Sequence, residues 1–454
     1  MKLSKQCGSS VRVVSRAARV GAWLGVALLS GCEGSSVVGP STISSDAGLA
    51  DVSVADVSVA DVRVVDVGPS AMQAPANRPQ PGMRPPPIAG PAAFGSPLTG
   101  LTPAQIQAFT DGLEEFQNQE TVEGGLGPLF NNTGCFVCHG VPATGGSTNL
   151  HVTRFGRLTA GVFDPMENEG GSLMQQSAID RSAREFIPST ANVTARRQST
   201  ALFGLGLVEA IDDATIIANA LTEMPAVRGT VAMVMDVTTN TMRVGRFGWK
   251  AQQATLLAFS GDAYVNEMGI TNRFYPTENA PNGDLARLAA SDTVADPEDQ
   301  VDPVTGMADI DHAADFMRYL APPPPLPPSP SIMTGSMVFG ATGCADCHTP
   351  SMTTGASAVA ALDHQVVHLF SDLLLHDMGS LGDGIAQSPA TTTQMKTAVL
   401  WGIRASAPYL HDGRANTLDA AILAHEGQGA PSRDRYRALN AMQRQQLLDF
   451  LGAI

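Results

Sequence analysis

Two short segments of the chain share a pattern of residue types that can bind a cofactor. Each has two cysteines separated by two residues and followed at once by a histidine: Cys135, Cys138 and His139 in one, and Cys344, Cys347 and His348 in the other. Thiols at this spacing add to the vinyl groups of a haem, and the adjacent histidine then ligates the iron. The pattern predicts two covalently bound haem c groups. The alternatives are a thioredoxin-like redox pair or half of a zinc site.

The two remaining cysteines, Cys7 and Cys32, lie near the N-terminus. Residues 1–19 carry five basic and no acidic residues, and a short apolar run follows at 20–29. This arrangement is typical of an export signal and is too short to span a bilayer. Residues 29–32, Leu-Ser-Gly-Cys, resemble the lipobox of bacterial lipoproteins, which implies a signal peptide over 1–31 and lipidation of Cys32. An ordinary secretory signal is the alternative, and either signal takes the chain out of the cytoplasm. With the lipid anchor, the expected location is the cell envelope, periplasmic or outer-membrane associated.

Changes in amino-acid composition divide the rest of the chain into a low-complexity segment and two predicted domains. Residues 32–97 are of low complexity, with an aspartate every five residues from Asp51 to Asp66 and a proline-rich stretch at 75–91. We expect this segment to be a tether. A second proline run at 322–328 lies between the two motifs and indicates a domain boundary. The predicted domains are therefore a first haem c domain over 98–325 and a second over 326–454.

The charge is strongly acidic. The chain has a net charge of −15, and without residues 1–31 this becomes about −20, because that segment holds five basic residues and no acidic one. Such a surface repels nucleic acid and favours basic partners, such as a small basic cytochrome c or a cupredoxin acting as electron donor. The predicted membrane contact is through the lipid anchor only.

Helical signals dominate the body. Thr102 and Pro103 are typical of a helix start, and apolar residues at helical spacing continue to Phe116. Helices are also expected over 253–264, 310–320 and 441–454. Strand patterning is confined to 230–246, where a hairpin is expected around Thr239 and Asn240. The predicted fold is mainly α, with two cytochrome c-like haem domains in tandem and a small β-hairpin insertion.

The amino-acid sequences of the two halves of the body are weakly similar to each other. Residues 216–219, Ile-Ile-Ala-Asn, align with residues 422–425, Ile-Leu-Ala-His, so His425 stands where the first half has Asn219. A haem with a strong second axial ligand transfers electrons, whereas one with an open face can bind peroxide or oxygen. The asymmetry predicts different roles for the two haems.

Residues 407–414, Ala-Pro-Tyr-Leu-His-Asp-Gly-Arg, and 417–422 resemble a segment of bacterial di-haem cytochrome c peroxidases. The body from about residue 98 to 454 is more similar to the related di-haem oxidoreductases often labelled thiol oxidoreductases. The segments that carry this resemblance are residues 127–131, 153–156, 203–207, 247–251, 266–271 and 375–379. Because all four body cysteines belong to the motifs, nothing in these residues supports a thiol reaction.

The resemblance implies roles for three further residues. In the peroxidases a methionine fourteen residues after the histidine of the His-Asp-Gly segment ligates the electron-transfer haem, and here that position is His425. We therefore expect His348 and His425 to ligate the second iron together. The distal glutamate of the family corresponds to Glu267, which is expected to act as an acid and base on peroxide. Trp249, eighteen residues earlier, corresponds to a tryptophan that lies between the haems. A surface histidine, a loop glutamate and a core tryptophan are the alternatives.

Other histidines carry weaker signals. His151 is a candidate distal ligand of the first haem, with a loop residue as the alternative. His364 and His368 have the spacing of one helix face and could bind a metal, although a third ligand is missing. His376 and His411 are expected to hydrogen-bond haem propionates or backbone.

These observations predict an extracytoplasmic di-haem oxidoreductase of peroxidase type. The second haem would accept electrons from a donor, and the first would reduce peroxide or a related oxidant. The alternatives are a di-haem cytochrome that only transfers electrons and a di-haem oxidase or oxygenase of an organic substrate.

Overall fold

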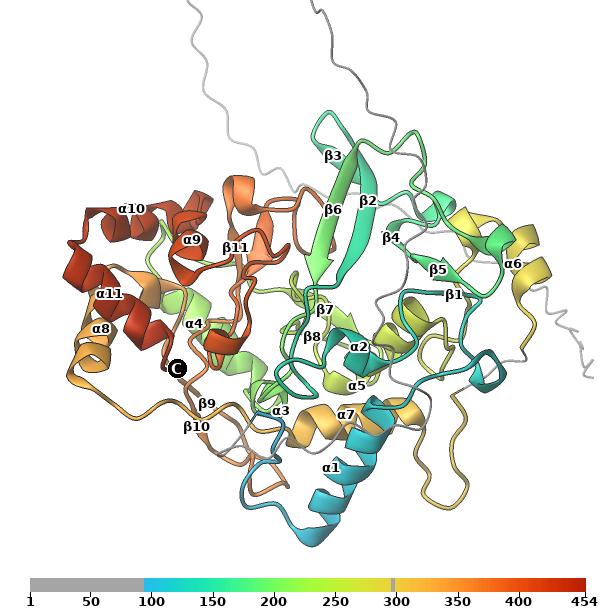
Figure 1. Ribbon diagram of the computed structural model, residues 1–454, viewed down its shortest axis with the longest axis horizontal. Helices are drawn as coiled ribbons and strands as arrows, with labels where there is room; N and C mark the ends of the chain where they lie inside the picture. The colour runs from blue at the N-terminus through green and yellow to red at the C-terminus, as the bar shows by residue number, and fades with distance from the viewer. Residues whose placement is uncertain (1–93, 295–298) are drawn as a thin grey trace, which may run out of the picture. The chain divides into compact units, whose positions relative to one another are not determined.

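The computed structural model describes residues 94–294 and 299–454 (Figure 1). The expected signal peptide, the lipidated Cys32 and nearly all of the expected tether lie outside these residues. Within the described part, no helix has the length and apolar character needed to cross a membrane.

Helices contribute most of the regular structure, as the sequence predicts. The helices of the described residues are α1 (Pro103–Phe116), α2 (Cys135–Cys138), α3 (Leu205–Glu209), α4 (Asp213–Thr222), α5 (Leu256–Ala263), α6 (Leu285–Ser291), α7 (Asp309–Tyr319), α8 (Pro330–Ala341), α9 (Leu418–Leu423), α10 (Ala430–Ala438) and α11 (Ala441–Leu451). The four predicted helices are confirmed as α1, α5, α7 and α11 to within a few residues.

Helices α1 and α7 pack against each other beneath the first motif (Figure 1). α1 begins with a capping box, in which the Thr102 hydroxyl accepts from the Gln105 backbone and the Gln105 side chain accepts from the Thr102 backbone. Gly112 allows close approach, because a Cβ atom there would lie 2.3 Å from the His312 carbonyl oxygen. The Phe116 ring lies 4.7 Å from that of Phe316, and burial of each such side chain contributes about 1.5–3 kcal/mol.

Five small sheets accompany the helices in the part of the chain that the structure describes. Their strands are β1 (Leu129–Phe130), β2 (His151–Thr159), β3 (Val162–Asp164), β4 (Ser172–Met174), β5 (Ser177–Ala178), β6 (Val193–Gln198), β7 (Met233–Asp236), β8 (Thr241–Val244), β9 (Met352–Thr353), β10 (Val366–Val367), β11 (Leu375–Asp377) and β12 (Gln394–Lys396). The expected hairpin is confirmed as β7 and β8, with Met235 opposite Met242.

The largest sheet corrects the expectation that strands are confined to the hairpin. Strand β2 is central: it pairs antiparallel with β6 over residues 151–156, with β4 over 153–155 and with β3 over 157–159. β2 and β6 carry arginine, glutamine and threonine where a strand pattern requires apolar residues. Their polar side chains are hydrogen-bonded to residues that are distant in the sequence, so the residue pattern within each strand does not predict it.

Three hydrophobic clusters form the core of the described residues: two larger ones and a small one of Ala232, Ala251, Leu375 and Ala390. The largest contains α1, α3, α5 and α7, and it also includes Leu369, Leu373 and Leu374 from beyond the second motif. The second contains residues of α8, α10 and α11 beside the second motif, among them Phe339, Tyr436 and Phe450. The segment after the second motif therefore completes the core of the region that carries the first.

Candidate active site

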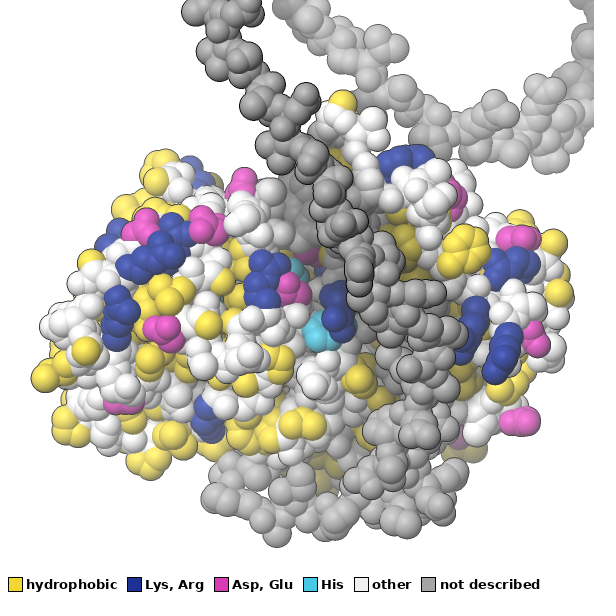
Figure 2. All heavy atoms as spheres, turned by 45° about the horizontal axis from the view of Figure 1, so that its top comes forward, with side chains coloured by type: hydrophobic (Ala, Val, Ile, Leu, Met, Phe, Trp, Pro, Cys, Tyr) yellow, Lys and Arg dark blue, Asp and Glu magenta, His cyan; other side chains and the backbone are white. Residues whose placement is uncertain are grey.

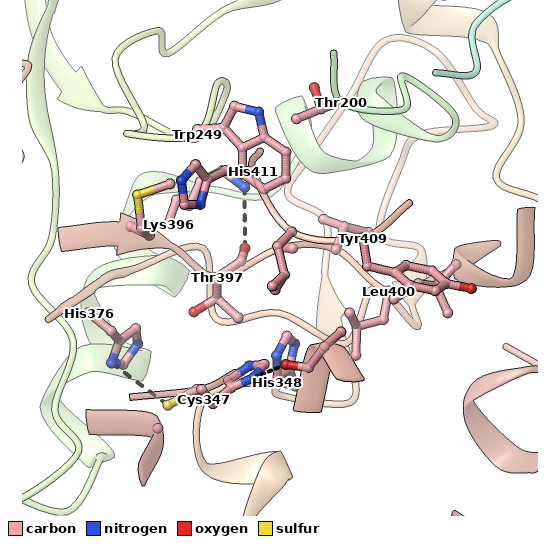
Figure 3. Close-up of a pocket in the computed structure, with 18 of the residues that line it drawn as sticks. Thr200, Trp249, Cys347, His348, His376, Lys396, Thr397, Leu400, Tyr409 and His411 are labelled. Atoms are coloured by element: carbon pink, nitrogen blue, oxygen red, sulfur yellow. Dashed lines mark hydrogen bonds between the residues drawn. The ribbon is translucent and has the colours of Figure 1, made fainter. Parts of the chain in front are cut away.

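A cavity of about 300 Å³ lies against the second motif. Its wall includes Cys344, Cys347, His348 and, from the segment after α9, His425. Figure 3 shows Cys347 and His348 at one end of this cavity, and Trp249 with His411 at the other. The structure thus brings together the two cysteines, the motif histidine and the residue expected as the second axial ligand.

Both histidines of this cavity are oriented by hydrogen bonds to carbonyl groups. Nδ1 of His348 lies 2.9 Å from the Phe370 carbonyl oxygen, and Nδ1 of His425 lies 2.9 Å from that of Ala421. Because Nδ1 donates a hydrogen bond in each ring, Nε2 is the nitrogen that remains free to bind a metal. Burial lowers the pKa of both imidazoles, that of His348 to about 4, so they are neutral and able to ligate iron. Both side chains line the same cavity, and His425 also contributes to the lowered pKa of His348.

The first motif lies in helix α2 and is fixed by polar contacts. Nδ1 of His139 lies 3.1 Å from the Gly146 carbonyl oxygen. The Ser199 hydroxyl donates to the Cys138 carbonyl at 2.6 Å, and the Asn132 amide lies 3.4 Å from the Cys138 sulfur. Burial lowers the pKa of His139 to about 4, so this imidazole is also neutral and suited to ligate iron.

Glu267 lies beside the first motif. It belongs to the π-helical turn Tyr264–Met268, which continues from α5 and ends at Gly269. Gly269 has a φ of 73°, and a Cβ atom there would lie 2.4 Å from the Leu129 carbonyl oxygen, so the pattern Glu-Met-Gly requires glycine at its third position. This close approach lets the Glu267 carbonyl accept hydrogen bonds from the backbone of Asn131 and Asn132.

The carboxyl group of Glu267 is held in a polar but buried setting. It accepts a hydrogen bond of 2.7 Å from the Asn131 amide. Burial raises its pKa above the ordinary value, while Asn131 and the Arg154 guanidinium oppose the shift. Glu267 in turn contributes to the raised pKa of Cys138, about 12, for which burial is the main cause. The structure therefore brings a carboxyl with raised proton affinity to the haem motif of the first half.

Trp249 connects the surroundings of the two motifs. Its indole lies on the cavity of the second motif, with its ring 6.2 Å from that of His411. Its N–H donates to the Gln198 carbonyl at 2.8 Å, and the next residue, Ser199, donates to the Cys138 carbonyl of the first motif. A short path of bonds thus joins Trp249 to the first motif, while its indole lines the cavity of the second.

A buried ionic cluster next to Trp249 was missed by the sequence analysis. The Asp383 carboxylate lies 2.6 Å from Arg197 Nη2 and 3.0 Å from Lys250 Nζ, and the three side chains are 1%, 4% and 0% exposed. Burial raises the pKa of Asp383, but the two cations outweigh burial and hold it below its ordinary value. Burial lowers the pKa of Lys250 to about 8. The cluster fixes Lys250, and with it the neighbouring Trp249, against the loop at 383–392.

Several other histidines differ from expectation. His151 is bonded to the Asp412 carbonyl through Nε2 at 3.0 Å, and its Nδ1 lies 3.4 Å from Arg196, so both ring nitrogens are engaged away from an iron. His364 and His368 do not share a helix: His364 has a φ of 48°, and the valines that follow it form β10. The predicted helical pair is therefore wrong.

The comparison of the two halves also misplaces Asn219. Its amide donates to the Thr349 hydroxyl at 3.4 Å, directly after His348 of the second motif. The residue that the structure brings to the first motif is Glu267.

His376 forms a buried group with Cys347 and Asp372, and within the described residues this is the one set of three possible ligands close enough to hold a metal. Its Nε2 lies 2.8 Å from Asp372, and its Nδ1 lies 3.7 Å from the Cys347 sulfur. Although burial lowers the pKa of His376, these hydrogen bonds raise it to about 10. Both ring nitrogens of His376 are therefore engaged within this buried group.

The residues of both motifs fit a haem. All four cysteines are free thiols, and burial raises the pKa of each, so none has the thiolate character of a thioredoxin-like redox pair. At the second motif the apolar cavity is bounded by the neutral His348 and His425. Cys135, Cys138 and His139 would hold one haem, and Cys344, Cys347, His348 and His425 the other. A bound haem would supply an iron that changes its oxidation state.

Comparison with known proteins agrees with this site. The model of a family described as "Di-haem oxidoreductase, putative peroxidase" matches residues 176–454, a stretch that contains Trp249, Glu267, the second motif and His425. No curated protein matches the chain.

Two solved structures are among those similar to the chain. One is hydrazine synthase of Kuenenia stuttgartiensis, at 13% identity and a TM-score of 0.37, covering 83% of this chain and 98% of the other. The second is a MauG-like protein associated with microbial copper homeostasis, at 15% identity and a TM-score of 0.28, covering 56% and 88%. Both TM-scores are too low to support an argument.

Proposed function

The chain belongs to the di-haem oxidoreductase family, and from this premise we propose that it reduces hydrogen peroxide at a first haem with electrons that it receives at a second. The observation that carries the proposal is the difference between the two motifs. A carboxyl group with raised proton affinity lies beside the first motif, and two neutral histidines face the cavity of the second.

Glu267 would do the proton transfers. Reduction of hydrogen peroxide to two molecules of water consumes two electrons and two protons. One peroxide oxygen must lose a proton and the other must gain one before it leaves as water, and a single carboxyl can serve both steps in turn. The hydrogen bond from Asn131 would orient the carboxyl for this role.

Electrons would pass from the second site to the first through the region of Trp249. Two observations support this path: Trp249 lines the cavity of the second motif, and its indole is linked through Gln198 and Ser199 to the first motif.

The donor would be a small electron-carrier protein, and the net charge of −15 favours a basic one. On the face shown in Figure 2, acidic and basic side chains are interspersed with hydrophobic ones over α8–α11. Weaker reduction by a basic cytochrome c at higher salt would support this choice of partner.

Rapid mixing tests the proposed function. The holoprotein with one haem reduced is mixed with hydrogen peroxide, and the spectra are followed. We expect oxidation of the reduced haem together with consumption of peroxide, and a high-spin component in the resting paramagnetic spectrum. Two low-spin haems and no reaction would favour a protein that only transfers electrons.

We further propose that both haems are covalently attached, since each motif presents two free thiols and a histidine. The double variant Cys135→Ser/Cys138→Ser is expected to carry one haem where the natural protein carries two. Intact-protein mass spectrometry after denaturation measures this, and Cys344→Ser/Cys347→Ser is the matched control that should lose the other haem. A natural protein that releases its haem on denaturation would contradict covalent attachment.

The role proposed for His425 predicts a change in one reduction potential. In the His425→Met variant a thioether would replace the imidazole, and the potential of the second haem should rise by a substantial part of the roughly 0.8 V range that axial ligands span. A redox titration followed by absorbance measures both haems, and the first should stay nearly constant. If both potentials stay unchanged, His425 is not a ligand.

For the location we propose lipid attachment through Cys32 in the cell envelope, supported by the basic start, the apolar run and the Leu-Ser-Gly-Cys sequence. The Cys32→Ser variant is expected to appear in the soluble fraction of the envelope. If it stays in the membrane fraction, another anchor holds the protein.

A further inference from the structure

A buried tyrosine and a buried glutamate are hydrogen-bonded close to the first motif. The phenol of Tyr264, which is 1% exposed, donates to Oε1 of Glu115 at 2.8 Å. Tyr264 is the first residue of the π-helical turn that also carries Glu267, and Glu115 lies in the last turn of α1. Single π-helical turns of this kind occur frequently at functional sites.

Both groups lie near Cys135, a residue that would attach the first haem. Burial is the main cause that raises the pKa of Tyr264 and that of Cys135. The neighbouring Cys135 also raises the pKa of Tyr264, and the charge of Glu115 raises the pKa of both groups. Cys135 packs against the hydrophobic cluster that contains Tyr264. The hydrogen-bonded pair therefore lies in the same part of the core as a thiol that would attach the first haem.

The groups that face Glu115 leave the phenol as its main stabilising partner. They are Tyr264 from the π-helical turn, Asp309 from α7, Glu120 from the segment after α1 and Asp299 from the loop before α7. Three of these four are acidic, so they disfavour a negative charge on Glu115. Burial is the main cause that raises the pKa of Glu115 to about 7, with Asp309 next, and the Tyr264 hydrogen bond opposes the rise. Glu115 can therefore both hold and release a proton near neutral pH.

We propose that Tyr264 and Glu115 form a redox-active pair that supplies one electron to the first haem while peroxide is being reduced. The inference rests on the proposed peroxidase function, with hydrogen peroxide as the oxidant. The phenol O–H bond would break, its proton would pass to the Glu115 carboxylate, and the ring would give up one electron to the cofactor held by the first motif. Tyr264 would then be a neutral radical beside a neutral Glu115. When an electron from the donor side reduced the radical, Glu115 would return the proton.

Paramagnetic resonance of the holoprotein tests the pair. Samples are frozen within milliseconds of mixing with hydrogen peroxide, in protein grown with and without ring-deuterated tyrosine. We expect a tyrosyl signal whose splitting changes with the label and which is absent from Tyr264→Phe. Tyr319→Phe is the matched control, because Tyr319 is another buried tyrosine of the same cluster and its loss should leave the signal unchanged.

Glu115→Gln provides a second variant that keeps the side-chain shape. The amide oxygen can still accept the phenol hydrogen bond but cannot take its proton, so the signal should form more slowly or not at all. This variant keeps the test valid if Tyr264→Phe does not fold.

An oxidant other than peroxide distinguishes the proposed redox pair from the proposed peroxidase function. In a second experiment a photoexcited ruthenium complex oxidises the same holoprotein after a light flash. Suppose that the flash produces a radical that depends on Tyr264 and Glu115, but the protein does not react with peroxide: this result would overturn the peroxidase function and support the redox pair. The redox pair would be overturned if peroxide is consumed and no tyrosyl signal forms in either experiment. It would also be overturned if the signal survives in both Tyr264→Phe and Glu115→Gln.

Discussion

The Asp383→Asn variant should lose about 3–5 kcal/mol of the free energy of unfolding. Asp383 is the carboxylate that lies between Lys250 and Arg197, and all three side chains are almost completely buried. Asparagine has a similar volume but no charge, so the substitution leaves two buried cations without a counter-ion. The cost comes from these uncompensated charges and not from a cavity.

Equilibrium unfolding of the holoprotein in urea measures the effect. Asp434→Asn is the matched control: Asp434 also contacts two cations, Arg433 and Arg437, but its side chain is 59% exposed. Exposed pairs contribute about 0–1 kcal/mol, so the control should change little. Equal losses in the two variants would show that the buried cluster does not stabilise the fold as proposed. Because Lys250 directly follows Trp249, a residue of the proposed electron path, the fluorescence of Trp249 should also change in Asp383→Asn alone.

The parts of the fold that local sequence signals determine were predictable. The start of α1 follows from Thr102, Pro103 and Gln105, each of which has a physical role in the cap that forms there. The hairpin of β7 and β8 follows from alternating apolar residues on either side of a turn. In both cases the partners that stabilise the element lie within a few residues of each other.

The sheet around β2 could not be predicted in this way, because its stabilising partners are distant. Gln198 of β6 donates to the carbonyls of Pro408 and Leu410, more than two hundred residues away, and Arg197 is bonded to Asp383 and Gln387. An arginine in a strand looks solvent-exposed until the carboxylate that neutralises it is known. The same long-range pairing explains why the buried cluster beside Trp249 was missed.

The residues of the site also divide into those that the sequence predicts and those that it does not. The two motifs carry their chemistry in adjacent residues, and the resemblance to the peroxidases, not spacing alone, is what pointed to His425, which lines one cavity with His348. Spacing alone failed for His364 and His368, because the valines between them pair with β9 as strand β10 and the chain cannot continue a helix there. The alignment of the two halves paired Asn219 with His425, whereas α4 brings Asn219 to Thr349, next to the second motif.

The two halves of the body depend on each other at the proposed electron path. His151 of β2 is bonded to the backbone of Asp412, and the Trp401 indole donates to the Phe203 carbonyl at 2.8 Å. Trp249 lies among these contacts. Because the contacts are between buried or half-buried groups, they hold the surroundings of the two motifs at a fixed separation, which rapid transfer of electrons between two haems requires.

The Glu267→Gln variant should react with hydrogen peroxide about 10²–10⁴ times more slowly than the natural protein. This loss corresponds to about 3–5 kcal/mol of the activation free energy. Glutamine keeps the size of the side chain and can still accept the hydrogen bond from Asn131, but it can neither take a proton from peroxide nor return one. Haem content and both reduction potentials should therefore stay nearly unchanged while the reaction slows.

The pH dependence of the same reaction distinguishes proton transfer from a structural effect. Burial raises the pKa of Glu267, and the base must be deprotonated to accept the first proton, so the rate in the natural protein should rise with pH through this raised pKa and then level off. The glutamine variant should lack that rise. Glu123→Gln, which changes an exposed glutamate near the same motif, is the matched control and should keep both the rate and the pH profile. Stopped-flow measurements on protein with one haem reduced provide these rates, and equal rates for Glu267→Gln and the natural protein would exclude Glu267 as the group that moves the proton.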